Sequence, residues 1–200
     1  FHAMQVASDA SVLGDFGNAE VFFHGIKSTF LQKEQDFAVE TMGSDGIEVT
    51  APIRYTFGHD PLQQYLVEME GGRLQALNLA WDTRPVSDGG QRWFHLQPDE
   101  TIKSSHPFFW TRHFSNWNTR CADCHSTNVT QGYDPIANMY ETRFSEANVS
   151  CEACHGDGRR HVALANEERL SKEKLGISVV VDVSDWHFQK GSATATRAAG

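Results

Sequence analysis

The sequence predicts an α+β protein in which a β-rich N-terminal unit precedes a mostly helical or irregular module. Three observations support this prediction: alternating hydrophobic segments between glycine turns in the first half, aromatic-rich sequence from about Pro107, and two Cys-x-x-Cys-His motifs after it. We expect four parts along the chain: an N-terminal segment (1–18), the β-rich unit (19–105), the motif-bearing module (106–175), and a strand with a flexible tail (176–200).

Two hairpins are predicted in the β-rich unit. The first surrounds Gly43-Ser44-Asp45-Gly46, because an Asp-Gly pair between alternating segments favours a tight turn. The second surrounds Gly71-Gly72, and residues 82–90 are expected to form a loop after it. The alternating segments that predict strands are 37–41, 47–50, 53–57, 62–67 and 74–81.

The module that follows has a different character. We expect its aromatic residues to form a hydrophobic core together with a cofactor face. Residues 161–175 have helix-forming composition, 177–183 form a short β-branched run typical of a strand, and 192–200 are typical of a mobile tail. The aromatic residues are Phe108, Phe109, Trp110, Phe114 and Trp117.

The two motifs are Cys121-Ala122-Asp123-Cys124-His125 and Cys151-Glu152-Ala153-Cys154-His155, and they contain all four cysteines of the chain. Two thiols three positions apart on one helical turn can add to the two vinyl groups of a heme, and the histidine that follows can bind the iron. Cys-x-x-Cys-His is accordingly typical of c-type heme attachment. The spacing predicts two covalent c-type hemes, so that residues 106–175 form a diheme-binding module.

Other classes of cysteine site explain the motifs less well. Paired Cys-x-x-Cys motifs also occur in zinc ribbons and in redox-active dithiols, and four cysteines can form a disulfide framework. None of these requires the two histidines, and with 10 His in 200 residues chance places one after a given cysteine in about one case in 20. The 26 residues between the pairs also exceed the roughly 15–20 of a zinc ribbon.

Composition limits the partners and the location. The net charge of −9 and the pI of about 5.5 argue against a nucleic-acid partner. No apolar run approaches the roughly 18 residues of a transmembrane helix. Heme is attached to this motif after export, so we expect a periplasmic or extracellular protein. The start at Phe1, without a signal peptide, indicates a mature, processed or incomplete chain.

Several sequence blocks in a fixed order resemble a known family, the bacterial multiheme cytochromes c that often carry a tetratricopeptide domain. In its heme motifs the chain is also similar to the broader hydroxylamine-oxidoreductase-like multiheme group. In that family further heme motifs precede and follow the matching region, so the chain resembles an interior portion. The blocks are 55–58, 61–67, 72–77, 80–85, 89–96, 116–118, 121–128 and 151–156.

The motifs provide His125 and His155 as proximal iron ligands, and the resemblance implies candidates for the opposite faces. His161, six residues after His155, corresponds to a family ligand of a neighbouring heme. His95 and His24 match family histidines in the β-rich unit, and His2 resembles a ligand of upstream hemes. Bis-histidine ligation of both hemes would imply low-potential electron transfer.

These features favour an electron-transfer protein over an enzyme. Its expected partners are redox proteins or other multiheme cytochromes. One alternative is a heme enzyme with an open iron site that acts on a small nitrogen or sulfur compound. Another is a subunit of an end-to-end assembly, in which a terminal histidine such as His2 ligates a heme of the adjoining copy.

Overall fold

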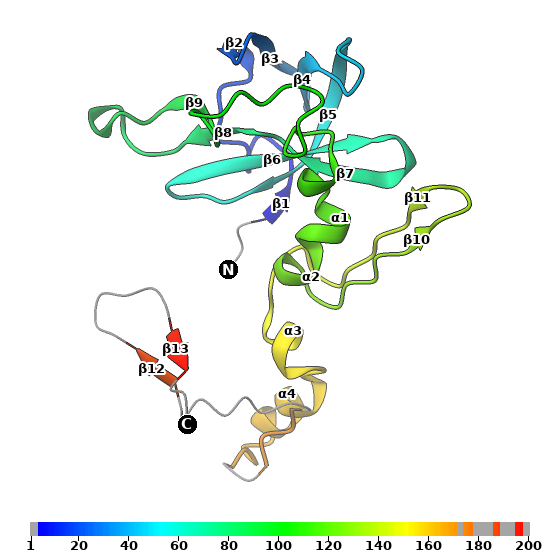
Figure 1. Cartoon of the computed structure of the whole chain (residues 1–200). Coiled ribbons are helices and arrows are strands. Elements are labelled where there is room, and N and C mark those ends of the chain that lie inside the picture. Colours follow the sequence, from blue (N-terminus) through cyan, green and yellow to red (C-terminus); the bar gives the residue numbers. More distant parts are fainter. Residues whose placement is uncertain (1–3, 172–173, 178–185, 189–194, 198–200) are drawn as a thin grey trace. The chain divides into compact units, whose positions relative to one another are not determined.

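A computed structural model of the chain describes residues 4–171, 174–177, 186–188 and 195–197. The chain divides into two compact units, Phe1–Val149 and Ser150–Gly200, and each is described by itself. The first unit contains a large antiparallel sheet followed by short helices, and the second begins with two helices (Figure 1). The α+β class is therefore confirmed, whereas the four predicted segment boundaries stay a prediction.

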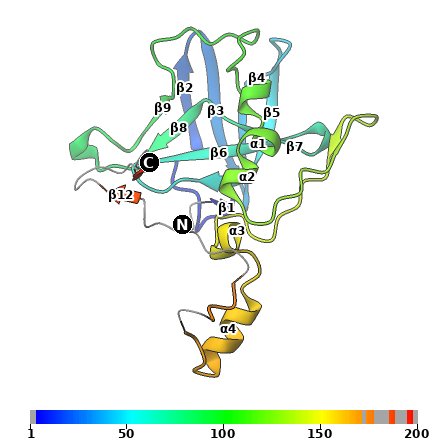
Figure 2. The same ribbon diagram turned by 60° about the horizontal axis from the view of Figure 1, so that its bottom comes forward.

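Nine strands form the sheet of the first unit. The strand order is β2-β3-β4-β5-β6-β8-β9, with β1 paired to β5 and β7 paired to β6. Figure 2 shows β2 and β3 beside β4 and β5, and these consecutive strands pair as hairpins. The strands are β1 (Met4–Val6), β2 (Gly17–Phe23), β3 (Ile26–Lys33), β4 (Asp36–Met42), β5 (Glu48–Phe57), β6 (Leu62–Met69), β7 (Arg73–Ala76), β8 (Leu79–Asp82) and β9 (Arg92–His95).

Both predicted hairpins are present. The β4–β5 turn is closed by a hydrogen bond from the Gly43 N–H to the Ile47 carbonyl (2.7 Å). In the β6–β7 turn, Gly71 and Gly72 have φ angles of 71° and 68°, in the left-handed region that favours glycine. A side chain at Gly72 would also collide with the Tyr140 carbonyl. The glycine signals therefore located the turns correctly.

The lengths of two strands differ from the prediction. Residues 48–50 of one predicted segment and all of 53–57 belong to one strand, β5, which continues through Pro52. The predicted strand 74–81 is divided into β7 and β8, and both pair with β6. The break falls at Asn78, whose side-chain amide donates to the Phe108 carbonyl (2.9 Å) and draws a distant segment onto this edge.

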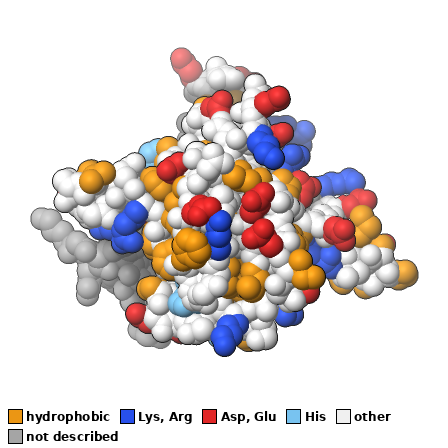
Figure 3. All heavy atoms as spheres, turned by 90° about the horizontal axis from the view of Figure 1, so that it is seen from above, with side chains coloured by type: hydrophobic (Ala, Val, Ile, Leu, Met, Phe, Trp, Pro, Cys, Tyr) orange, Lys and Arg blue, Asp and Glu red, His pale blue; other side chains and the backbone are white. Residues whose placement is uncertain are grey.

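An aromatic cluster fills the core of the sheet. Phe16 makes edge-to-face contacts with four rings at centroid distances of 5.2–5.6 Å, and Phe30 stacks on Trp93 at 3.5 Å. Each aromatic pair adds about 0.5–1.5 kcal/mol beyond the burial of its area. The first unit thus has a large core made of side chains. Other apolar side chains remain exposed, and Figure 3 shows such groups on one face among acidic and basic ones.

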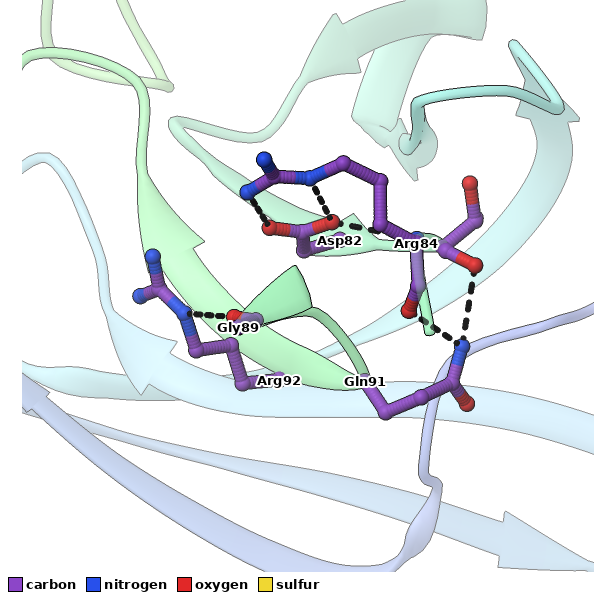
Figure 4. A network of polar contacts seen from close by, with 6 residues as sticks. Asp82, Arg84, Gly89, Gln91 and Arg92 are labelled. Atoms are coloured by element: carbon purple, nitrogen blue, oxygen red, sulfur yellow. Dashed lines mark hydrogen bonds and ion pairs between the residues drawn. The ribbon is translucent and has the colours of Figure 1, made fainter. Parts of the chain in front are cut away.

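The predicted loop after β8 is an ordered polar turn (Figure 4). The Arg84 guanidinium donates to the buried Asp82 carboxylate from Nε (2.9 Å) and Nη2 (2.6 Å). These hydrogen bonds lower the pKa of Asp82 to about 2, so the carboxylate is ionised at neutral pH. The Gln91 amide donates to the carbonyls of Thr83 (3.0 Å) and Arg84 (3.2 Å), which fixes the return of the chain into β9.

Short helices and strands lie between the strands of the sheet and after them. The predicted helix over 161–175 is shorter, because α4 ends at Asn166 and Glu168 adopts a left-handed φ of 55°. Apart from Ile177, the strand expected over 177–183 lies outside the described residues. So does the tail from Ser192, except for β13 (Ala195–Arg197). No helix among the described residues is long and apolar enough to cross a membrane. The elements are η1 (Glu70–Gly72), η2 (Val86–Asp88), η3 (His113–Ser115), α1 (Trp117–Arg120), α2 (Ala122–His125), β10 (Tyr133–Asp134), β11 (Met139–Tyr140), α3 (Cys151–His155), α4 (Arg159–Asn166), β12 (Trp186–Phe188) and β13 (Ala195–Arg197).

Candidate heme-binding sites

The first Cys-x-x-Cys-His motif lies on a single helical turn at the end of α1 and over α2. The Cys124 N–H (3.1 Å) and the His125 N–H (3.0 Å) both donate to the Cys121 carbonyl. This turn brings the two thiols, three residues apart, onto one side of the helix. Cys121 is half-buried, Cys124 and His125 are exposed, and neither thiol is in a disulfide. The motif can therefore reach a heme outside the helix.

Buried amide side chains attach the helix of this motif to the sheet unit. Asn116 caps α1 by accepting from the Thr119 N–H (3.1 Å). Asn118 is 1% exposed; its Oδ1 accepts from the Leu74 N–H (2.8 Å), and its Nδ2 donates to the Gly72 carbonyl (3.2 Å) and to Thr142 Oγ1 (2.9 Å). Two separate segments, the start of β7 and the chain at Thr142, thus hold α1 in place, which positions the motif that follows it.

The surroundings of the first motif fit a porphyrin. The His125 ring lies 6.0 Å from the Phe57 ring of β5 at an interplanar angle of 67°. Two buried polar atoms beside the motif, Trp117 Nε1 and Ser126 Oγ, lack a hydrogen-bond partner among the described residues. Such atoms cost free energy unless a hydrogen-bond partner satisfies them.

The Cys121 thiol is protonated at neutral pH, because burial, together with the nearby Cys124, raises its pKa.

The second motif forms α3 in the second unit, next to a pocket. None of the residues of α3 or α4 is buried. Helices this short are marginal without a packing partner. The pocket volume of about 670 Å³ falls within the roughly 300–1,000 Å³ of cofactor sites. The pocket is therefore large enough to accommodate a porphyrin. The pocket is lined by Cys151, Glu152, His155, Gly156, Gly158, Arg159, His161, Val162 and Ile177.

His161 faces this pocket with a defined tautomer. Its Nδ1 lies 2.7 Å from the Leu175 carbonyl oxygen. Because a carbonyl can only accept, Nδ1 carries the hydrogen and the lone pair remains on Nε2. Histidines that bind metals usually donate their other ring nitrogen in this way. The structure thus places His161 beside the second motif in a form able to bind iron.

His24 and His95 lie next to each other in the structure. Their ring centroids are 4.6 Å apart, His24 Nε2 donates to the Gln97 carbonyl (3.2 Å), and the Gln97 N–H donates to His95 Nδ1 (3.0 Å). These bonds leave the hydrogen of each ring on Nε2. Burial and the His24 ring lower the pKa of His95, which is therefore neutral at pH 7.

The axial roles inferred from the resemblance stay predictions. Binding iron through Nε2 would require His24 or His95 to exchange these hydrogen bonds. His2 lies outside the described residues. Phe57 and Asn118, in contrast, were not predicted as site residues. Asn118 lies within the quoted block 116–118, but nothing in the sequence signals that Phe57 contacts a histidine 68 residues away.

Comparison with known proteins agrees with this geometry. Residues 91–156 match the family described as cytochrome c554 and c-prime, and this range contains both motifs. Neither the curated proteins nor the solved structures include a match. The family match supports a c-type cytochrome, whose heme c is covalently bound.

Proposed function

We propose that the chain carries two covalent hemes and transfers electrons outside the cytoplasm. The main support is that each Cys-x-x-Cys-His motif occupies one helical turn, with its two cysteines outside any disulfide and its histidine on the same turn. When bound, heme supplies one-electron chemistry at iron. The Cys121–Cys124 and Cys151–Cys154 pairs hold the two porphyrins, and His125 and His155 bind the irons.

The two units make different contributions in this proposal. The sheet unit has its own aromatic core and holds the first motif rigidly through α1, whereas α3 and α4 of the second unit have no buried residue and are proposed to pack against a heme. Rigid attachment favours electron transfer, because the surroundings of the iron then change little between oxidation states. Burial and hydrogen bonds near the iron set the potential.

Finer parts of the proposal come from the family resemblance. The chain is proposed to be an interior portion of a multiheme cytochrome of the tetratricopeptide-associated type, related to the hydroxylamine-oxidoreductase-like group. Its location is proposed to be periplasmic or extracellular, because heme attachment to this motif follows export. Its partners would be redox proteins or other multiheme cytochromes, and assembly through heme ligation between copies would use His2.

Heme content tests the central claim. A pyridine hemochrome assay, together with the intact mass of protein matured with a heme-attachment system, is expected to show two covalent hemes per chain. The Cys121→Ser/Cys124→Ser variant should retain one heme, and so should Cys151→Ser/Cys154→Ser. Wild-type protein with fewer than two hemes would disprove the proposal. Retention of zinc in place of heme would do the same.

We also propose that His161 is an axial ligand. Its Nε2 lone pair is available because the Leu175 carbonyl fixes the tautomer. His161 lies only six positions after His155, too close in sequence to reach easily the far face of the heme bound at His155, which favours another heme as its target. A second histidine on that iron would give a low-spin, low-potential heme.

His161→Ala is expected to convert one heme from low spin to high spin, because one iron loses its axial nitrogen. The optical and electron paramagnetic resonance spectra of the ferric protein measure this change. Added imidazole should restore the low-spin signal, which separates ligation from a structural role. His59→Ala, at an exposed histidine, serves as the matched control. Unchanged spectra for His161→Ala would show that this histidine does not bind iron.

A further inference from the structure

Charge is distributed unevenly in the segment before the first heme motif. Residues 101–120 contain no Asp or Glu, although the whole chain contains 26 and has a net charge of −9. The same segment carries Lys103, Arg112 and Arg120, and it ends directly before Cys121. A cationic segment on an acidic protein favours a locally positive potential.

Part of this segment forms an exposed cluster, which we call the aromatic-cationic patch; it consists of His106, Phe108, His113, Phe114 and Arg120. Phe108 and Phe114 are 46% and 49% exposed, and their rings stack at 4.9 Å. The Arg120 guanidinium lies 5.1 Å from the centre of the Phe114 ring and contacts His113 Nε2. The remaining member, His106, lies 5.9 Å from the Phe108 ring.

Arg120 differs from several exposed arginines of the chain in its partners. Arg143 pairs with Glu141 at 3.2 Å and Arg159 pairs with Asp157 at 2.5 Å. No carboxylate in the described part of the chain forms an ion pair with Arg120. Its charge is therefore not neutralised by a neighbouring carboxylate, and the stacked rings beside it are open to solvent.

We propose that the aromatic-cationic patch is the docking surface for an acidic redox protein that exchanges electrons with the heme on Cys121 and Cys124. This inference rests on the proposed function. Aromatic residues and arginine are enriched at protein interfaces, where they supply most of the binding energy. The net charge of −9 disfavours an acidic partner elsewhere on average, whereas Arg120, which has no ion pair in the described part of the chain, favours one here, and attraction to this patch brings the partner to the residue preceding Cys121.

The test uses the full heme-loaded chain and a plant-type [2Fe–2S] ferredoxin as the acidic probe. In the redox step, reduced ferredoxin loses one electron and one ferric heme becomes ferrous. The dissociation constant of the two oxidised proteins is measured by calorimetry, and the reduction rate by stopped flow, both over a range of ionic strength. Arg120→Gln is expected to weaken binding about tenfold at low ionic strength and to flatten the salt dependence.

Two further variants separate charge from aromatic contact. Phe108→Ser/Phe114→Ser should weaken binding about tenfold while the salt dependence stays that of the wild type. Lys33→Gln, which removes one positive charge from an exposed position outside the patch, should bind within about twofold of wild type. Equal weakening by Lys33→Gln would show that net charge alone matters, and that would overturn the proposal.

The remaining outcomes are also decisive. Unchanged binding for both patch variants overturns the docking surface. Sedimentation that shows a dimer in wild type and a monomer in the patch variants would assign the surface to a second copy instead. Reduction by dithionite is measured in parallel: if dithionite reduces the hemes but ferredoxin shows no patch dependence, only this inference fails. A chain without a reducible covalent heme refutes the proposed function itself.

Discussion

Replacement of Cys151 and Cys154 by serine is expected to leave residues 150–171 without stable structure while the sheet unit stays folded. The helices α3 and α4 have five and eight residues, and none of these residues is buried. Isolated helices shorter than about 12–15 residues are marginal in water, so we expect the proposed heme to supply most of their stability by packing against them. Amide hydrogen exchange measures the change, as a loss of protection in α3 and α4 with unchanged protection in β4 to β6.

The first motif provides the control for this experiment. Cys121→Ser/Cys124→Ser also removes one heme, but the aromatic cluster around Phe16 remains, so the strands should keep their protection. The two variants therefore remove the same cofactor and differ in the structure lost. Persistent protection of α3 and α4 without heme would mean that polypeptide contacts alone hold the second unit together.

The elements that could be predicted from the sequence depend on local chemistry. Two thiols and a histidine must share one helical turn to bind heme, and the structure places both motifs on such turns. The Gly43–Gly46 and Gly71-Gly72 turns follow from backbone conformations that other residues adopt poorly. In each case the sequence signal and the structure it specifies lie within a few residues.

The features that could not be predicted depend on contacts between distant segments. The division of the predicted strand 74–81 at Asn78 is an example, because the Phe108 carbonyl to which Asn78 donates lies 30 residues away. The burial of individual rings in the aromatic-rich segment could not be predicted either. Phe109, Trp110 and Trp117 are buried as expected, whereas Phe108 and Phe114 are exposed. Hydrophobicity predicts that some of these rings are buried. Which rings are buried depends on the path of the backbone, which determines the side chains that face the core.

The candidate heme sites also contain features that the sequence predicts and features that only the fold determines. The spacing identifies the proximal histidines, but the chemical state of the other histidines depends on hydrogen bonds that only the folded chain provides. His161 and His95 both have ordinary histidine chemistry in the sequence. In the structure, the Leu175 carbonyl leaves a lone pair on Nε2 of His161, whereas the Gln97 N–H leaves a hydrogen on Nε2 of His95. Their capacity to bind iron therefore differs for reasons outside the motif.

Trp117→Ala is expected to lower the free energy of unfolding of the first unit by about 3–5 kcal/mol, the usual cost of removing a buried tryptophan from a core. Trp117 is fully buried, packs in one cluster with Met4, Leu66 and Leu74, and begins the helix that leads into the first motif. Denaturant unfolding followed by circular dichroism measures the loss in free energy.

In the optical spectrum of the heme-loaded protein, Trp117→Ala should change the signal of one heme only. Because Trp117 lies four residues before Cys121, the cavity left by alanine loosens the helix that carries His125, and the signal of the first heme should broaden. The heme of the second unit then serves as an internal reference. Trp117→Phe, which keeps an aromatic ring in the cluster, is the matched control and should lose less than half as much stability. Equal losses for both variants would mean that the packing around this ring does not hold the helix on the sheet unit.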